Sequence, residues 1–280
     1  MIFSVFCAFG EAQISISGNV NWETMLLNAE ISLDLPSAGL RLPSGRTQGE
    51  ILLSAGYLNL IRPHLLNLQV DSSSTLRDLV ERGEIYLSQV NTVALGADAI
   101  PPAMKPDMRL LFSSHTISLS GLSSVLLRHS RPAPAVRSLS PVSTARYTGI
   151  IVIAAEELPV HGQRSSALPV PCLFPKIWDT DMNLIYDRNM LETRGNMVRY
   201  SSLQNIFQNN PSGLTNELQQ IVGERPLRIF ARGTFGINPT DLIIDRNDAL
   251  LIISSEENRS LLSQGRVVFI LDDSKLKYNF

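Results

Sequence analysis

The side chains that could carry chemistry are few and lie far apart. None of the four histidines, His64, His115, His129 and His161, is followed by another metal ligand within four residues. Metal sites need convergent ligands, so each histidine is interpreted as a surface or core residue. No phosphate-binding loop, zinc-protease helix or nucleophile elbow occurs. We therefore assign no catalytic, cofactor-binding or metal-binding residue and expect a protein that is not an enzyme.

One acidic segment has both a chemical and a structural interpretation. Asp179, Asp181 and Asn183 place oxygen ligands at the spacing that opens a calcium loop. Leu184 stands where that loop needs glycine, and Met190 stands where it needs a bidentate glutamate. An ordinary hairpin turn is therefore the favoured interpretation.

Three arginines and one cysteine complete the candidates. Arg228 and Arg232 are four residues apart on an expected strand and share a face, so with Arg246 they could clamp a carboxylate or phosphate. The balanced charge of the chain favours a solvated sheet face instead. Cys172 follows Pro171 in an expected loop and is interpreted as inert. A hydrolase with a Ser–His–Asp triad assembled from distant residues stays open as a third hypothesis. It ranks behind the structural role and the ligand-binding role described below.

The first twelve residues, MIFSVFCAFGEA, resemble the end of a secretory signal peptide. Residues 1–9 are apolar, and Gly10 and Ala12 are small residues at the two positions that a signal peptidase reads. A buried N-terminal strand is the alternative. Phe6 before Cys7 argues against lipidation, which needs a small residue there. Removal of this segment would leave Cys172 as the only thiol, so no intramolecular disulfide is expected.

Composition narrows the class of protein. The 280 residues are 44% hydrophobic, which is enough to bury a sizeable core. With 24 basic and 26 acidic residues the net charge is −2, and neither half has the basic surplus of a nucleic-acid binder or a polybasic membrane anchor. No uninterrupted apolar run approaches the ~20 residues of a transmembrane helix. We expect no nucleic-acid partner and no transmembrane span.

A proline-rich stretch divides the chain. Residues 130–144, SRPAPAVRSLSPVST, contain three prolines and have no clear period, which is typical of an extended connector. The predicted fold class is α+β: two small mixed units, each a sheet covered by helices, at residues 13–129 and 145–280. Residues 1–12 precede them as the signal remnant. A single core running through the connector would contradict this division.

The first unit alternates between strand-like and helix-like patterns. Period-two alternation predicts strands within 14–35 and over 108–119. A turn at 42–45 leads into a predicted helix over 46–60, which Pro63 kinks or follows with another helix. Shorter helices are predicted over 75–82, 84–97 and 121–128. The predicted buried face of the helix at 46–60 consists of Ile51, Leu52, Ala55, Leu58 and Ile61.

The second unit begins with a continuous apolar run, YTGIIVIAA (147–155), typical of a central strand covered on both faces. A hairpin is predicted over 176–186, weak helix over 200–222, and a strand over 226–235. Asp245 is predicted to cap a helix through Ile253, followed by a second helix over 256–262 and a core strand over 266–271. We expect the strands at 226–235 and 266–271 to lie side by side.

Several segments of the second unit carry a family resemblance. TGIIV (148–152), PKIWD (175–179), LIY (184–186), PLRIFARG (226–233), DA (248–249) and RVV (266–268) together resemble bacterial envelope proteins related to the flagellar outer-disc lipoprotein and the flagellar H-ring assembly protein. These are packing and turn positions. The resemblance covers residues 145–272 and implies an envelope role in which the protein contacts other proteins.

We therefore expect a non-enzymatic structural or assembly protein of the cell envelope, located in the periplasm. An association with the outer membrane or the flagellum is a further expectation. Its expected partners are other envelope proteins, including copies of itself. The alternative function is a periplasmic binding module for a small ligand or cell-wall fragment, held between the two units.

Overall fold

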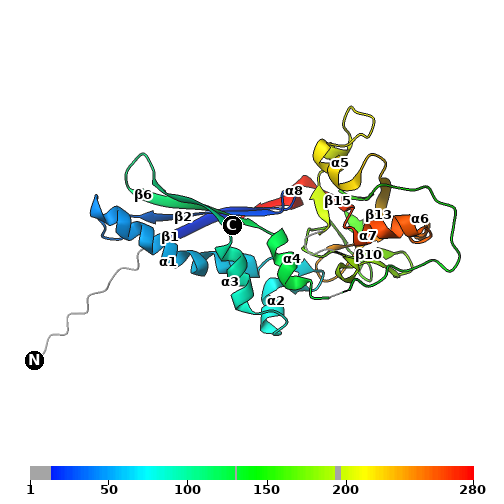
Figure 1. Cartoon of the computed structure of the whole chain (residues 1–280), viewed down its shortest axis with the longest axis horizontal. Coiled ribbons are helices and arrows are strands. Elements are labelled where there is room, and N and C mark those ends of the chain that lie inside the picture. Colours follow the sequence, from blue (N-terminus) through cyan, green and yellow to red (C-terminus); the bar gives the residue numbers. More distant parts are fainter. Residues whose placement is uncertain (1–13, 130, 193–196) are drawn as a thin grey trace, which may run out of the picture.

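The computed structural model describes residues 14–129, 131–192 and 197–280. The chain is α+β and forms two units, each built on one main sheet (Figure 1), which confirms the predicted fold class. The signal-like residues 1–12, with Cys7, lie outside the described residues. Within the described part of the chain, no helix combines the length and apolar character needed to cross a membrane.

The first sheet has five strands in the order β16-β1-β2-β6-β5. Strands β1 (Ile14–Asn21) and β2 (Leu26–Asp34) form a hairpin, and β2 also pairs with β6 (Leu110–Ser118). Strand β5 (Asp98–Met104) is an edge strand paired with β6, and all these pairs are antiparallel. Along β2, buried and half-buried residues alternate, as expected when only one face of a sheet is covered.

Helices α1 (Ser44–Leu66) and α3 (Leu87–Leu95) lie on the same side of this sheet in Figure 1. Helix α2 (Leu76–Glu81) begins at the N-cap Thr75, whose side chain and Asp78 form a capping box. Helix α4 (Ser120–Leu126) follows β6 directly. A short ladder of β3 (Gln69–Asp71) and β4 (Ser74–Thr75) connects α1 to α2. No helix of the described residues covers the opposite face of the sheet in Figure 1.

The buried face of α1 differs from the predicted one. Of the predicted residues only Ile61 is buried, and Ile51 is 64% exposed. A Cβ on Gly49 would lie 2.8 Å from Leu35 Cδ2, so at this position the close approach of the helix to the sheet depends on glycine. Pro63 lies inside the helix. The buried positions recur every four residues: Gly45, Gly49, Leu53, Tyr57, Ile61 and Leu65.

The second sheet has seven strands in the order β11-β10-β14-β13-β7-β15-β12. Its centre is parallel: β7 (Ile150–Ala154) lies between β13 (Leu227–Phe235) and β15 (Val267–Leu271). The prediction that β13 and β15 are adjacent is therefore wrong, because β7 lies between them. A strand that we did not predict, β14 (Asp241–Ile244), precedes the helices, and the parallel partner of β15 on its other side is β12 (Arg199–Ser201).

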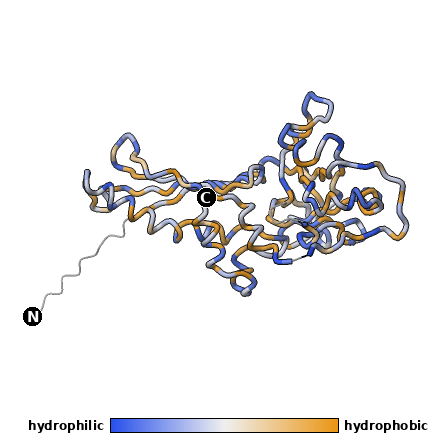
Figure 2. Tube along the Cα trace, in the orientation of Figure 1, coloured by the Kyte–Doolittle hydropathy of each residue, from blue (hydrophilic) through white to orange (hydrophobic). Residues whose placement is uncertain are grey.

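The remaining elements complete the second unit. The predicted hairpin is confirmed as β10 (Ile177–Asp179) and β11 (Leu184–Tyr186), which pair antiparallel. Helices α6 (Arg246–Ile253) and α7 (Glu256–Ser263) supply apolar side chains to one buried cluster, and α5 (Asn216–Val222) supplies them to another. Figure 2 shows hydrophobic segments running through this unit's interior. Short elements fill the loops: β8 (Leu158–Pro159), β9 (Ser166–Ala167), η1 (Arg188–Met190) and η2 (Leu203–Ile206).

The end of the chain returns to the first sheet. Helix α8 (Asp273–Leu276) leads into β16 (Lys277–Asn279), which pairs with β1. The backbones of Gly18 and Phe280 exchange two hydrogen bonds of 3.1 and 3.0 Å, and the Phe280 ring stacks on His64 with centroids 3.9 Å apart. Assigning all of residues 145–280 to the second unit was therefore wrong for the last few residues, because the free edge of β1 accepts them.

The two units share one core. A single cluster of buried apolar residues includes members from both, which contradicts the expectation of separate cores. Trp22 meets Tyr200 edge-on with centroids 5.8 Å apart, and the backbone N–H of Leu173 donates to the carbonyl of Gln69. Residues 131–144 form no helix or strand and run along α6, where the Val142 N–H donates to the Ser254 hydroxyl. The division holds for the sheets and not for the core.

Candidate functional site

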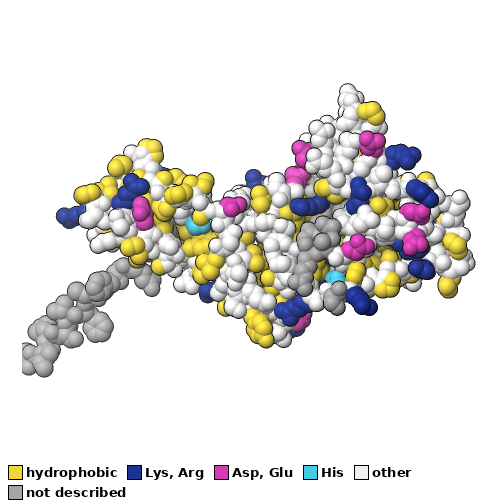
Figure 3. Space-filling model, viewed as in Figure 1, with side chains coloured by type: hydrophobic (Ala, Val, Ile, Leu, Met, Phe, Trp, Pro, Cys, Tyr) yellow, Lys and Arg dark blue, Asp and Glu magenta, His cyan; other side chains and the backbone are white. Residues whose placement is uncertain are grey.

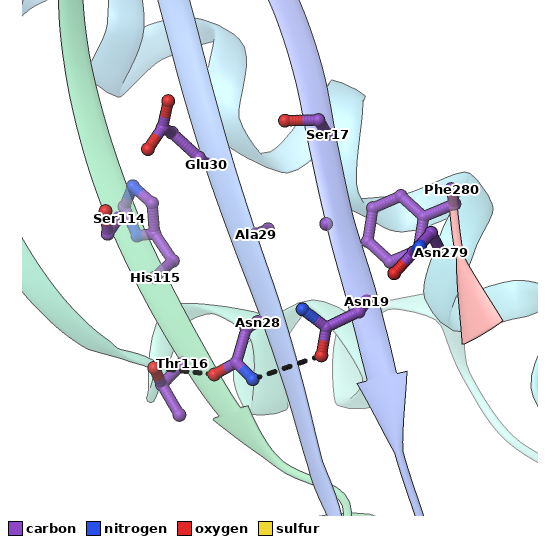
Figure 4. A pocket seen from close by; sticks show the side chains of 11 residues that line it. Ser17, Asn19, Asn28, Ala29, Glu30, Ser114, His115, Thr116, Asn279 and Phe280 are labelled. Atoms are coloured by element: carbon purple, nitrogen blue, oxygen red, sulfur yellow. Dashed lines mark hydrogen bonds between the residues drawn. The ribbon is translucent and has the colours of Figure 1, made fainter. Parts of the chain in front are cut away.

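The open face of the first sheet is hollowed by a trough of about 500 Å³ (Figure 4). Its lining follows from the period of the strands, because every second side chain of β1, β2 and β6 points away from the helices. Strand register brings these side chains into two rows that cross the sheet. One row, here called the amide row, consists of Asn279, Asn19, Asn28 and Thr116; the other consists of Ser17, Glu30 and Ser114.

The amide row is partly linked by its own hydrogen bonds. Thr116 Oγ1 donates to Asn28 Oδ1 at 3.1 Å, and Asn28 Nδ2 donates to Asn19 Oδ1 at 3.4 Å. A primary amide has two N–H donors. Among the described residues, no partner takes the N–H groups of Asn19 or the second one of Asn28. The row therefore holds its side chains in place and still offers donors to a ligand.

The floor of the trough is backbone. Gly18, Ala29 and His115 stand between the two rows, and the side chains of Ala29 and His115 lie toward the helices. The His115 ring stacks on Tyr57 of α1 with centroids 4.1 Å apart and shares a 2.9 Å hydrogen bond with the Ser113 hydroxyl. Burial lowers the pKa of His115, which favours its neutral form. His115 thus supports the floor and does not face the trough.

The trough is nearly neutral. Glu30 is the one carboxylate side chain among its described lining residues, and Lys105 Nζ lies 3.2 Å from it. The same ammonium lies 5.4 Å from the centroid of the Phe112 ring, the next outward residue on β6. The pair is about 40% exposed, so it contributes little to stability, but it leaves no described side chain of the trough with an unpaired charge.

A second hollow, of about 490 Å³, lies at the end of the first unit that is distant from the second. We call it the distal hollow; it is lined by Leu35, Pro36, Gly39, Leu40, Arg41, Leu42 and Met108. Leu42 is 42% exposed and Met108 is 57% exposed. Figure 3 shows hydrophobic and basic side chains side by side over this end. A flexible methionine at the rim suits an apolar side chain from another protein.

The most deeply buried carboxylate lies where the units meet. Asp241 is fully buried, and its Oδ2 accepts hydrogen bonds from Ser72 Oγ of the first unit at 3.1 Å and from Trp178 Nε1 at 3.2 Å. Its Oδ1 accepts from the Lys176 N–H and from Thr240 Oγ1, both at 3.2 Å. Burial raises the pKa of Asp241, although these donors oppose the rise. With four donors and no access to solvent, Asp241 joins the units rather than serving a ligand.

The histidines do not converge on one site. His64 stacks on Phe280, His161 lies beside Phe235, and His129 shares a 2.9 Å hydrogen bond with the Leu191 carbonyl. The serine partner of His115 is buried, and no described carboxylate bonds that ring. Among the described residues no group of three or more potential ligands could hold a metal ion.

The other sequence candidates have structural roles. Asp179 closes the predicted hairpin turn by accepting hydrogen bonds from the N–H groups of Asp181 and Asn183, at 2.9 and 2.8 Å. Cys172 is fully buried, and burial raises the pKa of its thiol, which keeps it protonated.

The three arginines do not form a clamp. Each has its own partner, which agrees with the favoured interpretation of a solvated sheet face. Arg228 donates to the carbonyls of Ile206 and Ser212. Arg246 pairs with Asp181 at 2.6 Å, whereas Arg232 lies 3.9 Å from Asp245.

Sequence reasoning missed both the trough and Asp241. The alternation of polar residues along 14–35 and 108–119 was a usable signal, because it marks one polar face on each strand. The order of the strands and the return of the chain end at Asn279 were needed to place those faces together. Asp241 gave no local signal, since its burial depends on Ser72, which lies in the other unit.

Comparison with known families assigns a relation to each unit. Residues 13–125 match the model of the Treponema pallidum Tp0624 N-terminal domain, and residues 149–273 match that of the Treponema pallidum Tp0624 second domain. The two matches follow the order that the domain names give, and the second ends just before β16 leaves for the first sheet. Neither match shows a link to flagellar disc or H-ring proteins. No curated protein matches the chain.

Proposed function

We propose that this protein is a non-enzymatic structural or assembly component of the bacterial cell envelope, acting in the periplasm through contacts with other proteins and with copies of itself. The observation that carries the proposal is the distal hollow. It combines an apolar lining with partly exposed Leu42 and Met108 at the end of an elongated molecule.

The burial and the hydrogen-bond partners of two ionisable groups support a role without catalysis. The most deeply buried carboxylate, Asp241, is occupied by donors of its own chain, and Cys172 is enclosed in the core. Catalytic groups are usually held in a cleft with a free lone pair or proton. The envelope location rests on the signal-like residues 1–12 and on the resemblance to envelope proteins, and a flagellar association is proposed on the resemblance alone.

Sedimentation analysis of the full chain over a range of concentrations tests the proposal. We expect reversible self-association that the double substitution Leu42→Asp and Met108→Asp weakens at least tenfold, because each change places a charge against an apolar partner surface. Ile237→Asp is the matched control, since Ile237 is 82% exposed in the second unit and outside the distal hollow.

The proposal fails if the chain is monomeric at every concentration and crosslinking in cells gives the same partners for the double variant as for the unchanged protein. Circular dichroism of both variants verifies that they fold. A hydrolytic or transfer activity that survives purification would also contradict it.

A further inference from the structure

The trough on the first sheet has a lining that suits one class of ligand. Amides and hydroxyls supply most of the side chains that point into it, and each can both donate and accept hydrogen bonds. The hydroxyl groups of a sugar have the same dual capacity. The amide row retains unused N–H donors on Asn19 and Asn28, and these are held in position by the bonds that cross the strands.

We propose that the trough binds an uncharged oligosaccharide that lies across the strands along the amide row. Neighbouring strands are 4.7–4.9 Å apart, so four side chains from Asn279 to Thr116 extend over about 14 Å. That length exceeds a single sugar ring and favours a chain of rings. The two rows are two residues apart along each strand, or roughly 7 Å, which leaves room for the chain between them.

Charge distinguishes this ligand from an anionic one. Phosphate, sulfate and nucleic acid are bound by free arginine or lysine side chains. The lysine beside the trough, Lys105, is already paired with Glu30. The trough therefore offers an anion no uncompensated cation and offers a neutral polyol a continuous set of hydrogen-bonding groups.

Backbone pairing distinguishes the ligand from an extended peptide. A peptide gains affinity by adding a strand to a free edge and inserting side chains into pockets. The trough lies over the face of β16, β1, β2 and β6, whose backbones are paired with one another, and its floor at Gly18 and Ala29 is backbone without a side-chain pocket. A protein partner fits the distal hollow better, so this inference is independent of the proposed assembly function.

Calorimetric titration of the full chain tests the inference with cellotetraose, maltotetraose and fully N-acetylated chitotetraose as neutral probes. A heparin tetrasaccharide and a capped tetraalanine peptide are the comparison ligands. We expect saturable binding of at least one neutral probe. Asn28→Ala should weaken that binding about tenfold, as expected for the loss of a ligand hydrogen bond. Ser114→Trp should abolish it by filling the trough.

Ser32→Ala is the matched control, because Ser32 lies on the same strand and face as Asn28 but outside the trough. It should change affinity less than about twofold, within the ordinary effect of a surface substitution. Binding that is unchanged in both Asn28→Ala and Ser114→Trp would overturn the inference. So would equal or tighter binding of the heparin or peptide ligand, or no saturable binding of any neutral probe at millimolar concentration.

Discussion

The two sheets of this protein use their faces differently. In β2 of the first sheet only alternate residues are buried, whereas all five residues of β7 and all five of β15 in the second sheet are buried. The centre of the second sheet is therefore covered on both faces and serves as a core, whereas alternate residues of β13 remain exposed. The first sheet keeps one face for contact with solvent or a ligand, and its short polar side chains form a surface that no element of the described chain covers.

The residues expected to stabilise the fold and the residues expected to bind a partner or ligand therefore lie mostly in different units. The second unit supplies most of the doubly covered apolar strands, and it holds the first through Trp22, Tyr200 and the bonds around Asp241. The first unit carries the trough and the distal hollow. Substitutions in the second sheet should therefore affect folding, and those on the outward positions of the first should affect binding.

Substitution of neighbouring residues in each sheet gives the largest expected effects. Phe269→Ala should lower the free energy of unfolding by about 3–5 kcal/mol and Val268→Ala by about 2 kcal/mol, because both side chains of β15 are buried. In the first sheet Ile31→Ala should cost about 2–5 kcal/mol, and Ser32→Ala should stay within about 0.5 kcal/mol. Urea unfolding measures all four.

The comparison breaks if Ser32→Ala is as destabilising as Ile31→Ala. That result would mean that the open face is buried in solution against another surface. Equal slopes of the four unfolding curves against urea verify that each variant loses the same structure.

The Asp241 junction tests whether the two units depend on each other. Asp241→Ala leaves buried donors from Ser72 and Trp178 without an acceptor, so it should lower the free energy of unfolding by about 3 kcal/mol. Asp181→Ala removes an exposed ion pair with Arg246 and should cost less than about 1 kcal/mol. Guanidinium unfolding followed by tryptophan fluorescence compares the variants. A loss below about 1 kcal/mol for Asp241→Ala would mean that the junction does not couple the units.

Part of the local structure could be predicted from the sequence. The continuous apolar run at 147–155 and the turn at Asp179 predicted β7 and the β10–β11 hairpin, because burial on both faces and turn chemistry leave a mark on neighbouring residues. Strand β5 was missed because Pro101 and Pro102 argue against a strand, although they fit on an edge. Proline has no backbone N–H to donate, and the unpaired side of an edge strand does not require one.

What could not be predicted depends on residues far apart in the sequence. The adjacency of β7 to both β13 and β15, and the return of β16 to β1, are choices among strand orders that local patterns do not distinguish. The amide row draws Asn19, Asn28, Thr116 and Asn279 from four strands, so it exists only once register is set. The predicted face of α1 was wrong because its buried positions recur every four residues from Gly45 to Leu65, and two of them are glycines, which hydrophobic patterns ignore.

The returning chain end allows a smaller test of the first sheet. Phe280→Ala removes the ring that stacks on His64 and covers Gly18, where an added Cβ would lie 2.6 Å from that ring. We expect a loss of about 1–2 kcal/mol, less than for a fully buried phenylalanine because the residue is partly exposed. Phe230→Ala, at a residue 64% exposed on the second sheet, should change stability by about 0.5 kcal/mol or less. Similar effects at both positions would show that β16 is not held in the sheet.

The smallest expected effect is the pH dependence contributed by the first unit. Burial lowers the pKa values of both His64 and His115 below 6.5 in the folded chain. The unfolded chain therefore binds more protons as pH falls through 6.5, and the free energy of unfolding decreases over that range. The contribution of the two neutral histidines to stability is fully present above pH 6.5. It is lost progressively as the pH falls toward their pKa values in the folded chain. His115→Phe keeps a ring against Tyr57 and removes one titrating group, so its melting temperature should fall less on acidification. An unchanged slope in that variant would mean that the ring is as hydrated in the fold as in the unfolded chain, and that the floor of the trough is open to water from below.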